Sequence, residues 1–308
     1  MKKVSRFFLN IARGIGMGIS AIVPGVSGGT FAVALNCYDE VIIAIANIFK
    51  QFGKSFLILL PYAIGVVIGG ALGFFGVSQA LAYIMFSIIA LFAGLILGSI
   101  PNLFNEVKKE KIKNEYILGF NLSFIFVVAI ALIAFVLSIE HPHLAVEQLF
   151  VEPKWYLYLI MIPVGFLGAF ALVAPGISGS MILLVIGFYE PILDMIKNVI
   201  TQTNIWQNVG LLACFGFGVA VGFFIMSKIM KRLLEHHKAL TYSIIIGFVL
   251  GSLIAIFFNK SIYVGNDTYT GIMNNPKELF LGIPLFILGT LGSYFVIRLS
   301  KKKGAKAQ

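Results

Sequence analysis

The stretch Pro24-Gly25-Val26-Ser27-Gly28-Gly29-Thr30 interrupts an apolar run in which residues 14–38 carry no charge. A similar stretch, Pro175-Gly176-Ile177-Ser178-Gly179-Ser180, interrupts a second uncharged run over residues 155–189. Proline lacks the N–H that a helix interior needs, and glycine loses the most entropy on becoming helical, so each run should break near its middle. Small hydroxyl residues then begin a new helix. We therefore expect each run to form a re-entrant helical hairpin inside a membrane.

The composition is that of a helical membrane protein. Of the 308 residues, 59% are hydrophobic and 12% are charged, and the mean hydropathy is +0.97. Uncharged runs long enough to cross a bilayer recur along the chain, without the polar and apolar alternation of barrel strands. We expect an all-α polytopic membrane protein with one integral membrane domain. Six transmembrane helices should accompany the two hairpins, at about 56–77, 80–101, 116–139, 208–227, 239–258 and 279–297.

The basic residues predict the orientation of the chain. If both broken runs are re-entrant and the N-terminus is cytoplasmic, all but four of the 23 Lys and Arg residues fall in cytoplasmic segments. This distribution follows the positive-inside rule. Two ordinary crossings would instead move the basic cluster Lys108–Lys113 to the outside. We expect both termini in the cytoplasm, and the net charge of +10 does not indicate a nucleic acid partner.

The chain contains an internal repeat. The spacing that separates the two Pro-Gly motifs also matches Tyr38-Asp39 with Tyr189-Glu190, and Gly69-x-x-x-Gly73 matches Gly218-x-x-x-Gly222 at nearly the same spacing. Residues 1–140 and 155–300 are therefore predicted to be two copies of one unit, each with a hairpin and three transmembrane helices. Because each unit crosses the membrane an odd number of times, the second should be inverted. Inverted repeats with broken helices are typical of transporters.

The two breaks are the predicted substrate site. Each should present helix N-terminal N–H groups beside hydroxyls, which together bind an oxyanion. Arg13, the basic residue nearest to the first break, either neutralises that anion or anchors the topology. Alternatively, the glycines only permit close packing and the hydroxyls satisfy freed backbone groups. The candidate substrate-binding residues are Arg13, Pro24, Gly25, Ser27, Gly28, Gly29, Thr30, Pro175, Gly176, Ser178, Gly179 and Ser180.

Residues at the hairpin exits are candidates for proton coupling or gating, namely Tyr38, Asp39, Glu40, Tyr189 and Glu190. Alternatively, the carboxylates cap and solvate helix ends, and the tyrosines lie in an interfacial belt. The two cysteines and four histidines lack the spacing of metal ligands, and the chain has no nucleotide-binding phosphate loop. We therefore expect no metal, no cofactor and no catalytic residue.

Several motifs resemble those of a known bacterial family. Arg13-Gly14-x-x-Met17-Gly18, the motif at residues 24–30 and Tyr38-Asp39-Glu40 resemble the polyprenyl-phosphate transporter family, long catalogued as a domain of unknown function. Ala174–Ser180 and Gly187-Phe188-Tyr189-Glu190 resemble its second element. The resemblance covers nearly the whole chain. One departure is that the first exit has an Asn where the second has Gly187.

The resemblance implies a flippase of the bacterial cytoplasmic membrane. It would return undecaprenyl phosphate from the outer to the cytoplasmic leaflet, so that this lipid carrier is recycled in cell-wall polymer synthesis. The expected partners are the polyprenyl phosphate and membrane lipids, and a homodimer is left open. Moving negative charge inward opposes the membrane potential, so proton coupling is expected to assist.

Two other functions stay open at this point. Membrane undecaprenyl-pyrophosphate phosphatases also carry inverted repeats and a Pro-Gly-x-Ser element, followed there by arginine. Gly28 and Gly179 occupy that position here, and the apolar runs lack a pair of glutamates, so hydrolysis has little support. A transporter of a small anion would use the same two breaks.

Overall fold

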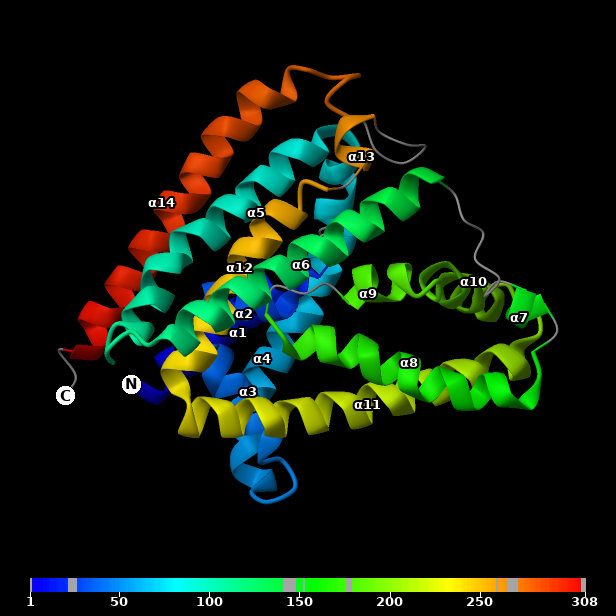
Figure 1. Ribbon diagram of the computed structural model, residues 1–308, viewed down its shortest axis with the longest axis horizontal. Coiled ribbons are helices and arrows are strands. Elements are labelled where there is room, and N and C mark those ends of the chain that lie inside the picture. The colour runs from blue at the N-terminus through cyan, green and yellow to red at the C-terminus, as the bar shows by residue number, and fades with distance from the viewer. Residues whose placement is uncertain are drawn as a thin grey trace.

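The computed structural model describes residues 2–21, 27–140, 148–151, 153–175, 179–258, 260–264 and 271–305, and within these ranges it contains helices and no strand. Figure 1 shows one set of long helices running diagonally across the view and a second set lying nearly horizontal below it. The elements are α1 (Lys2–Ser20), α2 (Gly28–Ala34), α3 (Tyr38–Ala46), α4 (Phe52–Leu72), the π-helical turn η1 (Gly73–Val77), α5 (Ser78–Val107), α6 (Asn114–Glu140), α7 (Gln148–Val151), α8 (Trp155–Val173), α9 (Gly179–Val185), α10 (Tyr189–Ile200), α11 (Ile205–His236), α12 (Lys238–Ala255), α13 (Lys260–Tyr263) and α14 (Glu278–Ala305).

Six helical stretches in the described part of the chain are long and apolar enough to cross a membrane. They confirm the six predicted spanning segments, but α11 continues well past its predicted end, because the basic residues after its apolar part stay helical. The candidate spans are Phe52–Gly76, Tyr83–Val107, Asn114–Ile133, Ile205–His236, Lys238–Ala255 and Glu278–Phe295.

Helices end on both sides of each Pro-Gly motif, where the sequence predicts a break. In the first half, α1 ends at Ser20 and α2 begins at Gly28. In the second half, α8 ends at Val173 and α9 begins at Gly179. The re-entrant path of the two broken runs, and the inverted relation of the halves, stay predictions.

Glycines bring α1 into close contact with α4 in the first half, and α8 into close contact with α11 in the second half. On α4, a methyl group at Gly65 or Gly69 would clash with the carbonyl oxygens of Ile11 and Ile15 of α1. On α11, Gly218 and Gly222 make the same kind of contact with α8. By their contacts, Gly65 and Gly69 correspond to Gly218 and Gly222. The sequence comparison paired Gly69 and Gly73 with these two glycines instead, which is one helical turn later on α4.

The remaining long helices pair across the two halves. The first-half helix α5 packs along α14, and the second-half helix α12 packs along α6. Here too small residues allow the contact, since a methyl group at Gly94 would clash with the carbonyl of Phe286, and one at Gly247 with the carbonyl of Phe120. The two halves are thus interlocked, with each holding the last long helix of the other.

Two backbone kinks occur at matching places. Within α5, Ile84 leaves the helical region with φ −138° and ψ 49°. His237, between α11 and α12, has φ −133° and ψ 49°. The helix that follows each kink is the one that packs against the other half: the rest of α5 packs along α14, and α12 packs along α6.

Candidate functional site

Ser27 and Thr30 of the first motif are buried and bonded to each other. The Ser27 side chain caps α2 by accepting from the Thr30 N–H at 3.1 Å, and the two hydroxyl oxygens lie 2.7 Å apart. Such capping satisfies helix N–H groups that have no intrahelical partner. The Ser27 hydroxyl thus satisfies one backbone N–H of α2. Gly28 and Gly29 form the first turn of α2, while Pro24 and Gly25 lie outside the described residues.

The second motif is described in part. Pro175 is buried after the end of α8, and Gly179 begins α9. Gly176 and Ser178 lie outside the described residues, as does the side chain of Ser180. The helices beside the two motifs meet, since α2 of the first half contacts α8 of the second.

Arg13 brings a positive charge to the base of the first broken run. It is half-buried on α1, and its Nη1 donates to Asn10 Oδ1 at 3.2 Å. It forms no ion pair with any side chain in the described ranges. The next residue, Gly14, packs against the backbone of Tyr62 on α4. The guanidinium therefore lies beside Tyr62, with no carboxylate at ion-pair distance among the described side chains.

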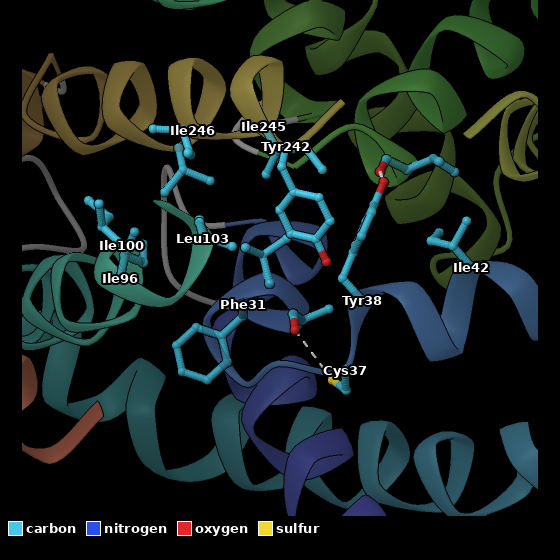
Figure 2. Packing of buried hydrophobic residues seen from close by; sticks show 14 of the residues in the cluster. Phe31, Cys37, Tyr38, Ile42, Ile96, Ile100, Leu103, Tyr242, Ile245 and Ile246 are labelled. Carbon is cyan, nitrogen blue, oxygen red and sulfur yellow. Dashed lines mark hydrogen bonds between the residues drawn. The ribbon is translucent and has the colours of Figure 1, made fainter. Parts of the chain in front are cut away.

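Tyr38, the first residue of α3, joins the first half to the end of α8, just before the second motif. Its side chain is 4% exposed, and its hydroxyl donates to the carbonyl oxygen of Val173 at 2.6 Å. Val173 is the last residue of α8, so its carbonyl can accept a bond from outside the helix. Figure 2 shows Tyr38 in the main buried cluster beside Tyr242 of α12. Tyr38 is thus an internal contact between the halves rather than an interfacial side chain.

Asp39 binds to the second half as well. Its Oδ2 accepts from the Tyr242 hydroxyl at 2.8 Å and lies 4.0 Å from Lys238 Nζ. The same ammonium lies 3.3 Å from Glu106 Oε2 at the end of α5. Burial raises the pKa of the Asp39 carboxyl, and the Tyr242 hydrogen bond and the Lys238 charge lower it in part. The net pKa is raised, which makes this carboxyl better able to hold a proton.

Glu40 has different partners from Asp39. Its two oxygens bind Arg6 Nη2 at 2.9 Å and the Tyr62 hydroxyl at 3.1 Å, which ties α3 to α1 and α4. The matching pair of the second half, Tyr189 and Glu190, begins α10. Tyr189 is partly buried there, and the side chain of Glu190 is not among those described.

Asn36 explains the one departure between the two exits. Its φ is 54°, and Gly187 at the matching position has φ 79°. Both positions require the left-handed region, which glycine and asparagine tolerate best. Asn36 Oδ1 also accepts from Asn102 Nδ2 of α5 at 3.1 Å. The substitution therefore keeps the turn and adds a contact to α5.

A pocket of about 160 Å³ opens between these groups. Carboxylates, phenols and an amide line it beside apolar side chains, with Asn36, Tyr38, Asp39, Glu40, Leu103 and Tyr242 among them. Two carboxylates repel a phosphate, so the pocket suits proton exchange better than binding of an anionic head group.

Sequence analysis did not identify the partners of these groups. Tyr242 and Lys238 come from a helix that is distant in sequence, and Tyr62 lies inside an apolar helix with no motif around it. The internal repeat does not find them either, because they bind the first turn of α3 through contacts between helices.

Comparison with known proteins gives matches over nearly the whole chain. Residues 17–272 match a family model described as undecaprenyl phosphate translocase-like. A polyprenyl-phosphate transporter of Staphylococcus aureus is 33% identical over 299 residues, which cover 95% of this chain and 97% of that protein. One of Vibrio cholerae is 27% identical over 267 residues, or 82% and 78% of the two chains. No solved structure matches. These matches confirm the resemblance drawn from the motifs, and the relatives are transporters by name, not enzymes.

Proposed function

Because the chain belongs to the undecaprenyl phosphate translocase-like family, we propose that it is a flippase returning undecaprenyl phosphate from the outer to the cytoplasmic leaflet of the bacterial cytoplasmic membrane. There the carrier is used again in cell-wall polymer synthesis. Six apolar helices and relatives named as polyprenyl-phosphate transporters support this function. The distribution of Lys and Arg supports cytoplasmic termini.

The phosphate head binds between the two Pro-Gly motifs, and the prenyl tail stays in lipid. The observation that carries this proposal is the hydrogen bond from Tyr38 to Val173, which joins the exit of one motif to the start of the other. The two copies of the motif therefore act as one site. Their hydroxyls and N–H groups suit a ligand that must bind and leave again.

Arg13 supplies the positive charge for the head group. Its guanidinium is half-buried and has no carboxylate partner in the described ranges, so a phosphate is free to pair with it. Ser27 and Thr30 bond to each other, so a phosphate that uses their hydroxyls must replace this bond. Ser178 holds the matching place in the second motif.

Opening and closing of the inner side involves the bonds of Tyr38 and Asp39 to the second half. When the two inverted halves rock apart, Tyr38 leaves Val173, and Asp39 leaves Tyr242 and Lys238. Asp39 is the carboxyl that exchanges a proton at this step, since burial raises its pKa. Glu40 stays bound to Arg6 and holds the exit helix in place.

Leaflet exchange in proteoliposomes tests the proposal. A labelled polyprenyl phosphate is reconstituted with the purified protein, and the accessibility of its head group on each side is followed over time. We expect Arg13→Ala to slow exchange at least about tenfold, because one charge-assisted hydrogen bond contributes about 1.5–3 kcal/mol. The double change Ser27→Ala with Ser178→Ala should also slow it, while Arg13→Lys retains part of the rate.

Lys111→Ala, at an exposed loop position, is the control and should leave exchange unchanged. Release of inorganic phosphate is measured in the same vesicles. Phosphate release would replace the flippase by a phosphatase. Transport of free phosphate without lipid exchange would favour a small-anion transporter.

A further inference from the structure

Glu278, which the mechanism above does not use, has a buried carboxyl group at the start of α14. The residue is 2% exposed. Its Oε2 accepts from the backbone N–H of Phe86 at 2.9 Å, and its backbone carbonyl accepts from the Ser87 hydroxyl at 3.1 Å. Its Oε1 is buried and has no hydrogen-bond partner. One side chain thus holds α14 against α5 and leaves one polar atom unsatisfied.

The kink in α5 explains why Glu278 binds there. Ile84 is not helical, so the next residues begin a new helix whose first N–H groups have no intrahelical acceptor. Phe86 supplies one of these N–H groups, and the carboxyl of α14 satisfies it. The bond therefore exists only while α5 is kinked and α14 is packed against the kink.

An ionised Glu278 has no ion-pair partner among the Lys, Arg and His side chains that the structure describes. The nearest titratable residues along the two helices are Tyr83 on α5 and Lys277 before α14, and both are exposed and unbonded to it. A buried carboxylate that has only backbone N–H donors, from Phe86 and Ser87, and no ion-pair partner is less favourable there than the protonated acid, which loses far less on burial.

We infer that Glu278 is a proton-binding site that controls closure of the outer end of the protein. The inference rests on the proposed function and names the coupling ion. With the proposed orientation, the start of α14 faces the outer side. The carboxylate takes a proton from outer water when α5 and α14 pack at the kink, and returns it when they separate.

The site is distinct from the Asp39 pocket. About 25 Å of helix, at 1.5 Å per residue, separates Phe86 from Leu103, which lines that pocket. Since α5 contacts Glu278 near one end and the pocket near the other, a change in the kink can reach both sides. Acidic outer water would thus favour closure at Glu278, with Asp39 exposed to the opposite side.

Spin-label distances test the closure without any transport. Labels are attached at Tyr83→Cys and Phe280→Cys, which are 69% and 82% exposed on either side of the contact, after Cys37 and Cys214 are replaced by alanine. We expect a short distance at acidic pH and a growing population of longer distances at alkaline pH. Glu278→Gln, which mimics the protonated acid, should keep the short distance at all pH values.

Lipid exchange then tests coupling. The wild-type rate should depend on outer pH, with site occupancy changing about tenfold per pH unit away from the midpoint. Glu278→Gln should lose this dependence, and Glu278→Asp should keep it with a shifted midpoint. The control Glu115→Gln removes an exposed carboxyl and should behave as wild type.

The outcomes separate the two proposals. A wild-type distance that does not change with pH, or a Glu278→Gln protein with unchanged pH dependence of exchange, overturns the inference about Glu278. Absence of any lipid exchange in the folded wild type overturns the flippase, while the distances still decide the role of Glu278. If Glu278→Gln does not fold, the wild-type and Glu278→Asp distances decide alone.

Discussion

Tyr38→Phe should loosen the contact between the two halves. The change deletes only the hydroxyl that donates to Val173 at 2.6 Å, and both residues are buried, with 4% and 0% exposed. A buried carbonyl that loses its donor costs about 1–3 kcal/mol. If the lost hydrogen bond destabilises the closed state by 1.4 kcal/mol relative to the open state, the open population rises about tenfold.

Cys37 reports this opening directly. It lies next to Tyr38 and is 2% exposed, and burial raises the pKa of its thiol to about 12, so it should react only after local opening. Its labelling by a membrane-permeant maleimide should become about tenfold faster in Tyr38→Phe, measured in a Cys214→Ala background. Labelling is followed by mass spectrometry, at a temperature well below unfolding.

The matched control for this change is Tyr294→Phe. Tyr294 is 40% exposed on α14, so loss of its hydroxyl should leave Cys37 labelling unchanged. An unchanged labelling rate in folded Tyr38→Phe would refute the argument, because the hydrogen bond would then not hold the halves together. Equal acceleration in both variants would point to a general loss of stability.

Two further changes test the packing and the turn. Gly69→Val should lower stability by about 1–3 kcal/mol, because its side chain would meet the carbonyl of Ile15, whereas Gly70→Val, with open space at that position, should change the thermal unfolding midpoint little. Asn36→Ala should destabilise the first exit by about 1–2 kcal/mol, because its φ of 54° is unfavourable for alanine; Asn36→Gly should retain more stability, and equal midpoints for the two variants would contradict this explanation.

The sequence predicted features that depend on local chemistry. A Pro-Gly pair in an apolar run breaks a helix whatever surrounds it, and length with hydropathy is enough to identify spanning helices. The helix ends at Ser20 and Val173 and the six candidate spans agree with this. The paired motifs were also specific enough to indicate the family.

Features that depend on partners were not predictable from the sequence. Glycines at spacing four indicate close packing, but nothing in the stripe at Gly94 says that its partner is α14. The kink at Ile84 has no proline or glycine beside it. Glu278 looks like an ordinary acidic residue at a helix start, a place where a negative charge is favourable. Its burial depends on α5, which lies almost two hundred residues earlier.

The exchange of long helices between the halves constrains how the protein is made. During synthesis α5 emerges long before α14, so its glycine face has lipid or another protein against it until the last helix is inserted. Neither half can complete its packing as a separate polypeptide, and loss of the C-terminal helix would leave the first half incomplete. Stable packing of the first half therefore requires that α14 has been inserted. A quality-control protease that recognises uncovered small-residue faces could distinguish finished from unfinished protein only after that step.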